Sequence, residues 1–263
     1  LNELGLRAHW DVISAGEEFF AVTKKFHNML HGKKARLSQD EIDLFLSTSE
    51  ENIKKMNLRG DIIFVHDPQP IVLVKKKPHL KKTKWLWRCH IDVSRPNAQV
   101  WDFLKPYVEE YDASVFSSPS FAQQLKIRQF LIPPSIDPLS DKNKELDPQT
   151  IAATLRKFGI ASDKPVIAQI SRFDYLKDPL GVVDVYKLVK KYIDCQLVLA
   201  GGTSADDPES TKVLAELQEK AKGDADIHIL SVPAASDLEI NALQRAADVV
   251  LQKSIREGFA LTV

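Results

Sequence analysis

The chain has 263 residues, and its 36 Lys and Arg balance 36 Asp and Glu. A net charge of zero argues against a dedicated nucleic-acid or membrane-surface binder. Apolar runs of about five residues are far shorter than the roughly 20 that a membrane helix needs. The two cysteines lie in apolar segments, as reduced core thiols of a cytoplasmic protein do, and no Cys/His cluster has zinc spacing. The 27% charged residues, with two Met and two Cys, favour a thermophilic source.

The first half of the chain alternates loosely between apolar runs and helical periodicity. Strands are expected at 6–12, 62–65, 85–89, 114–116 and 130–132, and helices at 17–30, 40–56 and 98–108. Residues 1–5 resemble the end of a helix that stops at Gly5. The Pro-rich stretch 132–138 fits neither pattern. We therefore place a domain boundary near residue 138, between domains 1–138 and 139–263.

The second half alternates more regularly. Strands are expected at 166–170, 196–200, 227–230 and 248–251, and helices at 179–193, 208–222 and 237–245. Near-continuous apolar strands separated by helices predict a parallel sheet that is covered on both faces. We expect an α/β protein of two Rossmann-like, doubly wound domains that bind ligand in a cleft between them. Phe259 is expected to begin one more helix, so both ends of the chain look truncated.

Polar residues follow almost every expected strand. Ligands of parallel sheets collect at the carboxyl ends of the strands. Ordinary loop polarity explains any one of these loops equally well, but six together favour a binding cleft. His66 and His90 in two of them are candidate proton donors, sugar ligands or ordinary structural histidines. The six segments are 66–69, 90–92, 117–118, 171–172, 201–203 and 253–257.

The loop 171–179 is the most specific of these segments. Arg172 directly follows a strand, and Lys177 lies just before the start of a helix. Two cations and free backbone N–H groups suit a diphosphate, although the spacing is not that of a P-loop. Two exposed cations that solvate a loop explain the pattern as well. Gly201 would let the backbone approach a ligand, but a plain turn is the default interpretation.

With these motifs placed, the sequence resembles the retaining glycosyltransferases of family 4, which have the two-domain GT-B fold. The Arg-x-x-x-x-Lys loop of that family is matched from Arg172 to Lys177. Its Glu-Gly-Phe-Gly-Leu segment is matched at 257–261, with Ala260 in place of the second Gly. His-Asp-Pro-Gln-Pro at 66–70 and the segment 87–92 resemble the subgroup that joins NDP-glucose to glucose to form trehalose.

The resemblance implies a role for each matched residue. Arg172 and Lys177 would bind the donor diphosphate, and Glu257 with the amides of Gly258 and Phe259 would hold the hydroxyls of the donor glucose. Other donor-side candidates are Gly201, Val232 (a guess for the base) and Leu261. The implied catalytic residues are His90, Glu257, Arg172 and Lys177. The implied acceptor-side residues are His66, Asp67, Gln69, Arg88 and Asp92.

The implied reaction is a reversible, retaining transfer of glucose from UDP-glucose or ADP-glucose to glucose, with no metal and no cofactor. Two cations would stabilise the leaving diphosphate, so no metal is needed. Front-face attack through an oxocarbenium-like state, the usual explanation of retention in the family, would need no protein nucleophile. The implied partners are NDP-glucose, glucose and trehalose, with no nucleic acid and no membrane, and a homodimer stays open. Alternative interpretations are a trehalose phosphorylase, a non-catalytic sugar-nucleotide-binding fragment and, less well supported by segment 66–70, a sugar-nucleotide epimerase.

Three parts of the family pattern would fall outside the chain, one of them the C-terminal helix that crosses back to the first domain. A second Glu that binds the nucleotide ribose would lie beyond Val263, and the Gly-rich loop of the first domain would precede Leu1. We therefore expect this polypeptide to bind NDP-glucose weakly and to turn over poorly, whereas a longer parent would be active.

Overall fold

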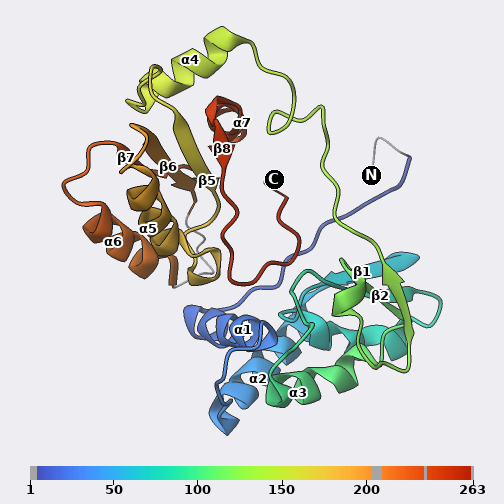
Figure 1. Ribbon diagram of the computed structural model, residues 1–263. Coiled ribbons are helices and arrows are strands. Elements are labelled where there is room, and N and C mark those ends of the chain that lie inside the picture. The colour runs from blue at the N-terminus through green and yellow to red at the C-terminus, as the bar shows by residue number, and fades with distance from the viewer. Residues whose placement is uncertain (1–4, 203–208, 234–235, 262–263) are drawn as a thin grey trace. The chain divides into compact units, whose positions relative to one another are not determined.

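The computed structural model describes residues 5–202, 209–233 and 236–261, and the chain divides into two compact units, Leu1–Pro133 and Pro134–Val263. We placed the domain boundary near residue 138, and the two units divide slightly earlier in the same Pro-rich stretch. Each unit has its own parallel sheet with helices beside it (Figure 1). Among the residues described, no helix is both long enough and apolar enough to cross a membrane.

The first unit contains a four-stranded parallel sheet in the order β1-β2-β3-β4. Neighbouring strands run in the same direction, so their carboxyl ends meet at one edge of the sheet. The register places His66 beside Arg88 at that edge, and Cys89 beside Phe116. The strands are β1 (Ile62–His66), β2 (Lys84–Cys89), β3 (Ala113–Phe116) and β4 (Arg128–Leu131).

The helices of the first unit share one core with the sheet. Trp85 and Trp87 alternate along β2 and point into this core, where they are at most 1% exposed, together with Phe26 and Phe45. A capping box between Ser38 and the third helical residue fixes the start of α2. The helices are α1 (Glu17–Leu30), α2 (Gln39–Lys55) and α3 (Ala98–Val108), with the 3₁₀ helices η2 (Ile71–His79) and η3 (Pro119–Phe121).

The second unit contains a parallel sheet in the order β7-β6-β5-β8. The chain builds outward from β5 to β7 and then returns to add β8 on the other side of β5. The loops after β5 and β8 therefore flank the point where the strand order reverses, which is where open α/β sheets bind ligands. The strands are β5 (Val166–Ile170), β6 (Gln196–Gly201), β7 (Ile227–Ser231) and β8 (Val249–Val250).

Helices cover both faces of this second sheet, as predicted. Leu197 and Leu199 of β6 pack in a core with α5 and α6, whereas the alternating Val198 and Ala200 pack in a separate core with α4 and α7. The predicted doubly wound α/β arrangement is confirmed for this unit. Its helices are α4 (Pro148–Lys157), α5 (Pro179–Val189), α6 (Glu209–Ala221) and α7 (Asp237–Ala246), with the 3₁₀ helix η4 (Tyr175–Lys177).

Two predicted elements are wrong. Residues 6–12 do not form a strand, and Trp10 and Val12 are more than 70% exposed, because no strand among the described residues pairs with this segment. Residues 259–261 do not begin a helix, because Ala260 has a φ of 64°, which a right-handed helix does not allow. The helix end expected at 1–5 lies outside the described residues except for Gly5.

Candidate functional site

Two loops of the second unit meet at the reversal of its strand order: the β5 loop (171–178) and the β8 loop (251–258). The amide of Ile255 donates a hydrogen bond of 2.7 Å to the carbonyl oxygen of Leu176, which joins the two loops. Beside this bond, Lys177 and Glu257 form an ion pair, and their side chains are 21% and 24% exposed. The structure thus brings together the cation predicted for the diphosphate and the acid predicted for the sugar.

The carboxylate of Glu257 lies among hydrogen-bond donors. It accepts from Gln252 Nε2 at 2.8 Å, from Ser254 Oγ at 3.1 Å and from the amide of Gly258 at 3.0 Å, in addition to Lys177. Burial raises the pKa of this carboxyl, but the hydrogen bond and the charge of Lys177, together with hydrogen bonds from Ser254 and the backbone, hold the pKa below its usual value. Glu257 is therefore ionised at neutral pH and acts as an acceptor.

The sequence predicted free backbone N–H groups at the start of α5, but the structure shows that Asp178 caps this helix start. Asp178 has a left-handed backbone with a φ of 49°, and its Oδ1 accepts the amide of Gly181 at 3.0 Å. The next residue, Pro179, has no N–H to offer. A carboxylate of the chain thus occupies the helix cap, and the prediction is wrong at this cap. Asp178 Oδ2 also pairs with Lys253 of the β8 loop.

Gly201, at the end of β6, supports the β5 loop directly. A Cβ atom at this position would lie 2.7 Å from the carbonyl carbon of Ser171, and closer still to its oxygen. It would also lie 3.4 Å from the Cα of Arg172. The sequence suggested that Gly201 lets a ligand approach the backbone closely. In the structure, the backbone of Ser171 makes this close approach. The amide of Val232, which is 7% exposed, donates to Gly201 O at 2.9 Å and extends the strand pairing there.

The other predicted donor-side residues lie at or near the surface. Arg172 is exposed in the β5 loop. Phe259 and Leu261 follow Glu257 in an irregular segment and are 43% and 53% exposed. The contacts of Gln252, Lys253, Ser254 and Asp178 were not predicted, although Lys253 and Ser254 were noted in the polar segment 253–257 and Asp178 lies in the loop 171–179. For Asp178, the sequence signal was an Asp directly before a Pro, which is typical of a helix start.

His66 and His90 are in direct contact at the carboxyl ends of β1 and β2. His66 Nδ1 lies 2.9 Å from His90 Nε2, and the rings stack with centroids 5.2 Å apart. The indole of Trp10 lies 5.7 Å from the His66 ring. Burial lowers the pKa of both histidines, with added repulsion from Arg88. The two imidazoles thus form a pair that shares one hydrogen bond while neutral.

Asp67 connects the ends of β1 and β2 through three hydrogen bonds. Its amide donates to the carbonyl oxygen of Arg88 at 2.8 Å, and its own carbonyl accepts from Trp87 Nε1 at 3.0 Å. Its Oδ1 accepts the amide of His90 at 2.9 Å. The backbone of Asp67 is left-handed, with a φ of 65°, a conformation in which Asp and Asn are enriched. Asp67 thereby fixes the backbone of His90.

Asp67→Asn is expected to change how stability depends on pH. Burial raises the pKa of this carboxyl from 3.8 to about 6, against the opposing effect of the His90 amide. Between about pH 4 and 6 the folded chain binds a proton that the unfolded chain does not, so the free energy of unfolding falls as pH rises. Asn keeps the acceptor but does not titrate. Urea unfolding of both proteins should show the wild type losing on the order of 2 kcal/mol relative to the variant across this window. Parallel profiles would contradict the assignment.

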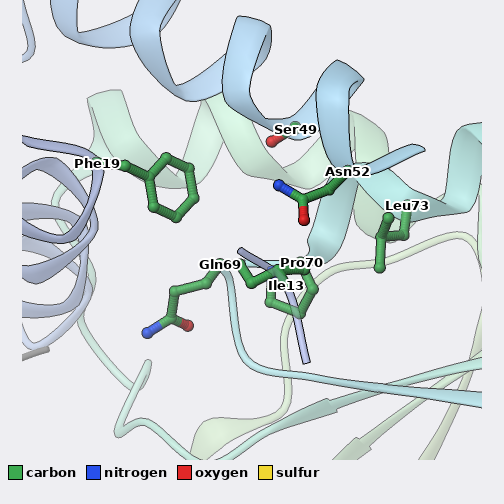
Figure 2. Close-up of a pocket in the computed structure, with 7 residues that line it drawn as sticks. All are labelled: Ile13, Phe19, Ser49, Asn52, Gln69, Pro70 and Leu73. Atoms are coloured by element: carbon green, nitrogen blue, oxygen red, sulfur yellow. The ribbon is translucent and has the colours of Figure 1, made fainter. Parts of the chain in front are cut away.

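The three remaining acceptor-side candidates lie in separate environments. Arg88 is 6% exposed, and its Nη2 donates to Ser117 Oγ at 3.3 Å, whereas its buried Nε has no hydrogen-bond partner among the described residues. Asp92 accepts the amide of Ser94 at 2.9 Å. Gln69 lines a small pocket with residues of α1, α2 and η2, which Figure 2 shows. This pocket does not admit a water molecule and is therefore no sugar site in this conformation.

The described part of the chain contains no group of three His, Cys, Asp or Glu side chains that could hold a metal ion. Cys89 and Cys195 are both buried and unbridged, as expected of core thiols. Burial raises the pKa of each thiol, which keeps it protonated at neutral pH.

Two parallel α/β units, one with a charged site at its strand reversal, are the architecture of the GT-B fold. A solved UDP-forming trehalose-phosphate synthase from Burkholderia xenovorans has this fold with a TM-score of 0.71 at 16% identity, over 94% of this chain and 67% of that one. Residues 1–123 match the trehalose synthase N-terminal domain, and residues 151–263 match the glycosyl transferases group 1 domain. The first unit is thus similar to the N-terminal domain of trehalose synthases, and the second unit is similar to group 1 glycosyltransferases.

Curated relatives show a similarity along the whole chain. The chain is 43% identical to a trehalose synthase of Pyrococcus horikoshii and 41% identical to one of Rubrobacter xylanophilus. Both matches include 100% of this chain, which spans 64% and 65% of the two relatives. A trehalose phosphorylase of Pleurotus pulmonarius is more distant, at 25% identity and 42% coverage of that protein.

Proposed function

We propose that the chain acts in a glucosyltransferase that moves glucose from an NDP-glucose donor to glucose and so forms trehalose. The observation that carries the proposal is the contact of Lys177 with Glu257 where the strand order of the second unit reverses. One side chain suits a diphosphate and the other suits sugar hydroxyls. Relatives named trehalose synthase, at 41–43% identity, support the product. Solved neighbours of the same fold include one in complex with UDP-glucose and one bound to ADP.

In the proposed reaction, the bond between the anomeric carbon of glucose and the diphosphate oxygen breaks. Lys177 and Arg172 stabilise the negative charge that develops on the leaving diphosphate, which lowers the barrier electrostatically. The acceptor hydroxyl forms the new bond to the same carbon, and its proton passes to the departing phosphate oxygen. Attack from the face that the diphosphate leaves retains the configuration. The proposal includes no metal ion and no covalent enzyme intermediate.

In the same proposal, residues of the first unit bind the acceptor glucose. The His66 and His90 pair offers both a donor and an acceptor to sugar hydroxyls, since one imidazole N–H is shared between the rings and the outer nitrogens remain. Asp67 fixes this pair by holding the backbone of His90. Arg88 would contribute the hydrogen-bonding capacity that its Nε does not use within the described residues.

The test is an assay for trehalose with matched donors. This chain, and the complete gene product where the gene encodes a longer one, is incubated with UDP-glucose or ADP-glucose and ¹³C-labelled glucose. We expect labelled α,α-trehalose with release of nucleoside diphosphate in the complete product. A parallel reaction with trehalose and phosphate tests the phosphorylase alternative through glucose 1-phosphate. Nucleotide-sugar binding without any turnover in either protein would favour the non-catalytic alternative and contradict the proposal.

A further inference from the structure

Two consecutive residues of the β5 loop carry opposite charges, and each pairs with an opposite charge of the β8 loop. Lys177 pairs with Glu257, and Asp178 pairs with Lys253. The backbone hydrogen bond between the loops lies close to both pairs. The loops are therefore held by two ion pairs of opposite polarity as well as by the backbone.

The two ion pairs differ in what remains if one of them opens. When Lys177 leaves, Glu257 still accepts hydrogen bonds from Gln252, Ser254 and the amide of Gly258. A buried carboxylate without hydrogen-bond partners would be costly, and these three donors prevent that. Lys177 can thus leave Glu257 and bind a ligand at a modest cost in free energy.

The second ion pair uses other atoms. Asp178 Oδ1 caps α5 through the amide of Gly181, and Oδ2 pairs with Lys253. Neither Lys177 nor Glu257 takes part, so this contact persists when the first pair opens. It ties the start of a regular helix to the β8 loop, and so it ties the loop to a rigid element of the unit.

We propose that Glu257 and an anionic ligand compete for Lys177, and that the Asp178–Lys253 pair keeps the two loops together while the Lys177–Glu257 pair is open. A bare diphosphate that takes Lys177 leaves two negative groups side by side, which is unfavourable. A diphosphate that carries a sugar also brings hydroxyl groups that donate to the released carboxylate. Glu257 then determines specificity for a sugar nucleotide over the nucleotide alone, and Lys253 is a positioning residue. This inference rests on the proposed function, which puts the diphosphate at Lys177.

Calorimetric titration with inorganic pyrophosphate, UDP and UDP-glucose tests the competition. Glu257→Gln keeps the size and the acceptor oxygen of the side chain and removes the charge. In this variant we expect pyrophosphate and UDP to bind about fivefold more tightly than in the wild type. The ligand then no longer has to break the partly exposed ion pair between Lys177 and Glu257. UDP-glucose should gain less, so the preference for UDP-glucose over UDP should fall. An unchanged affinity for pyrophosphate and an unchanged preference would overturn the inference.

Lys253→Met tests the positioning pair, because Met keeps the aliphatic stem without the charge. UDP and UDP-glucose should both lose affinity by a similar factor, and Lys253→Arg should restore it. The matched control is Lys222→Met, just after the end of α6, where the lysine side chain is 75% exposed. A purely structural role would lower the unfolding temperature without this common loss of affinity. Equal affinities in Lys253→Met and the wild type would overturn the positioning role.

The outcomes separate this inference from the proposed function. If the wild type binds pyrophosphate and UDP-glucose but Glu257→Gln changes neither, the competition alone is wrong. If the wild type binds neither ligand, and ADP-glucose also fails to bind, the donor site itself is wrong and both proposals fall together.

Discussion

Lys177→Met is expected to lower kcat/KM for trehalose formation by about 10²- to 10³-fold, the usual effect of removing one group that stabilises a developing charge. The ammonium group of Lys177 lies between the β5 loop and the carboxylate of Glu257, at the reversal of the strand order. Met fills similar space but offers no charge to the leaving diphosphate. The measurement is the initial rate of trehalose release at several concentrations of the preferred nucleotide-glucose.

The control for this variant is Lys222→Met, which removes a lysine whose side chain is 75% exposed near the end of α6. It should leave kcat/KM within about twofold of the wild type, because exposed charges far from a site contribute little. A Lys177→Met protein that is folded and turns over at the wild-type rate would show that Lys177 does not bind the diphosphate.

Gly201→Ala is expected to destabilise the second unit by about 3 kcal/mol and to weaken nucleotide-sugar binding. The added methyl group would lie 2.7 Å from the carbonyl carbon of Ser171 and 3.4 Å from the Cα of Arg172. Both are backbone atoms, so rotation of a side chain cannot relieve the overlap. The β5 loop has to move away from β6, and Arg172 moves with it. Urea unfolding and calorimetric titration with UDP-glucose measure the two effects.

Gly202→Ala is the matched control on the neighbouring residue. A Cβ atom there would lie 3.3 Å from the carbonyl oxygen of Val232, an approach that a shift of a few tenths of an ångström relieves. We expect a loss below about 1 kcal/mol and an unchanged affinity. Equal effects of the two substitutions would mean that Gly201 does not support the β5 loop in particular.

Much of the fold could be predicted because buried helices and strands leave a periodic record in the sequence. The expected bounds of α1 and α3 are those observed, and β5 was also expected at its observed residues. Residues 6–12 failed because strand formation depends on a partner that local apolar content does not specify. The helix α4 was missed, although Asp147 before Pro148 is a common helix start.

The candidate site was predictable in its position but not in its contacts. Polar residues after strands pointed to the β5 and β8 loops, because parallel strands gather their carboxyl ends at one edge. Three features of the site were not predictable. Two of them depend on how segments about 30 or more residues apart approach each other, and the third depends on which nearby group accepts the hydrogen bonds of the helix start. These are the pairing of Lys177 with Glu257, the contact of Gly201 with Ser171 and the cap that Asp178 supplies. A single sequence gives no measure of such approaches.

The shortness of β8 has a consequence for the dynamics of the second unit. Two residues of β8 pair with β5, so few backbone hydrogen bonds hold this edge strand. Such an edge opens locally at a small free energy, and its amides exchange with solvent early. A ligand that binds both the β5 and the β8 loops adds its binding free energy to the closed form. The amides around Leu251 should therefore show the largest gain in hydrogen-exchange protection when a nucleotide sugar is added.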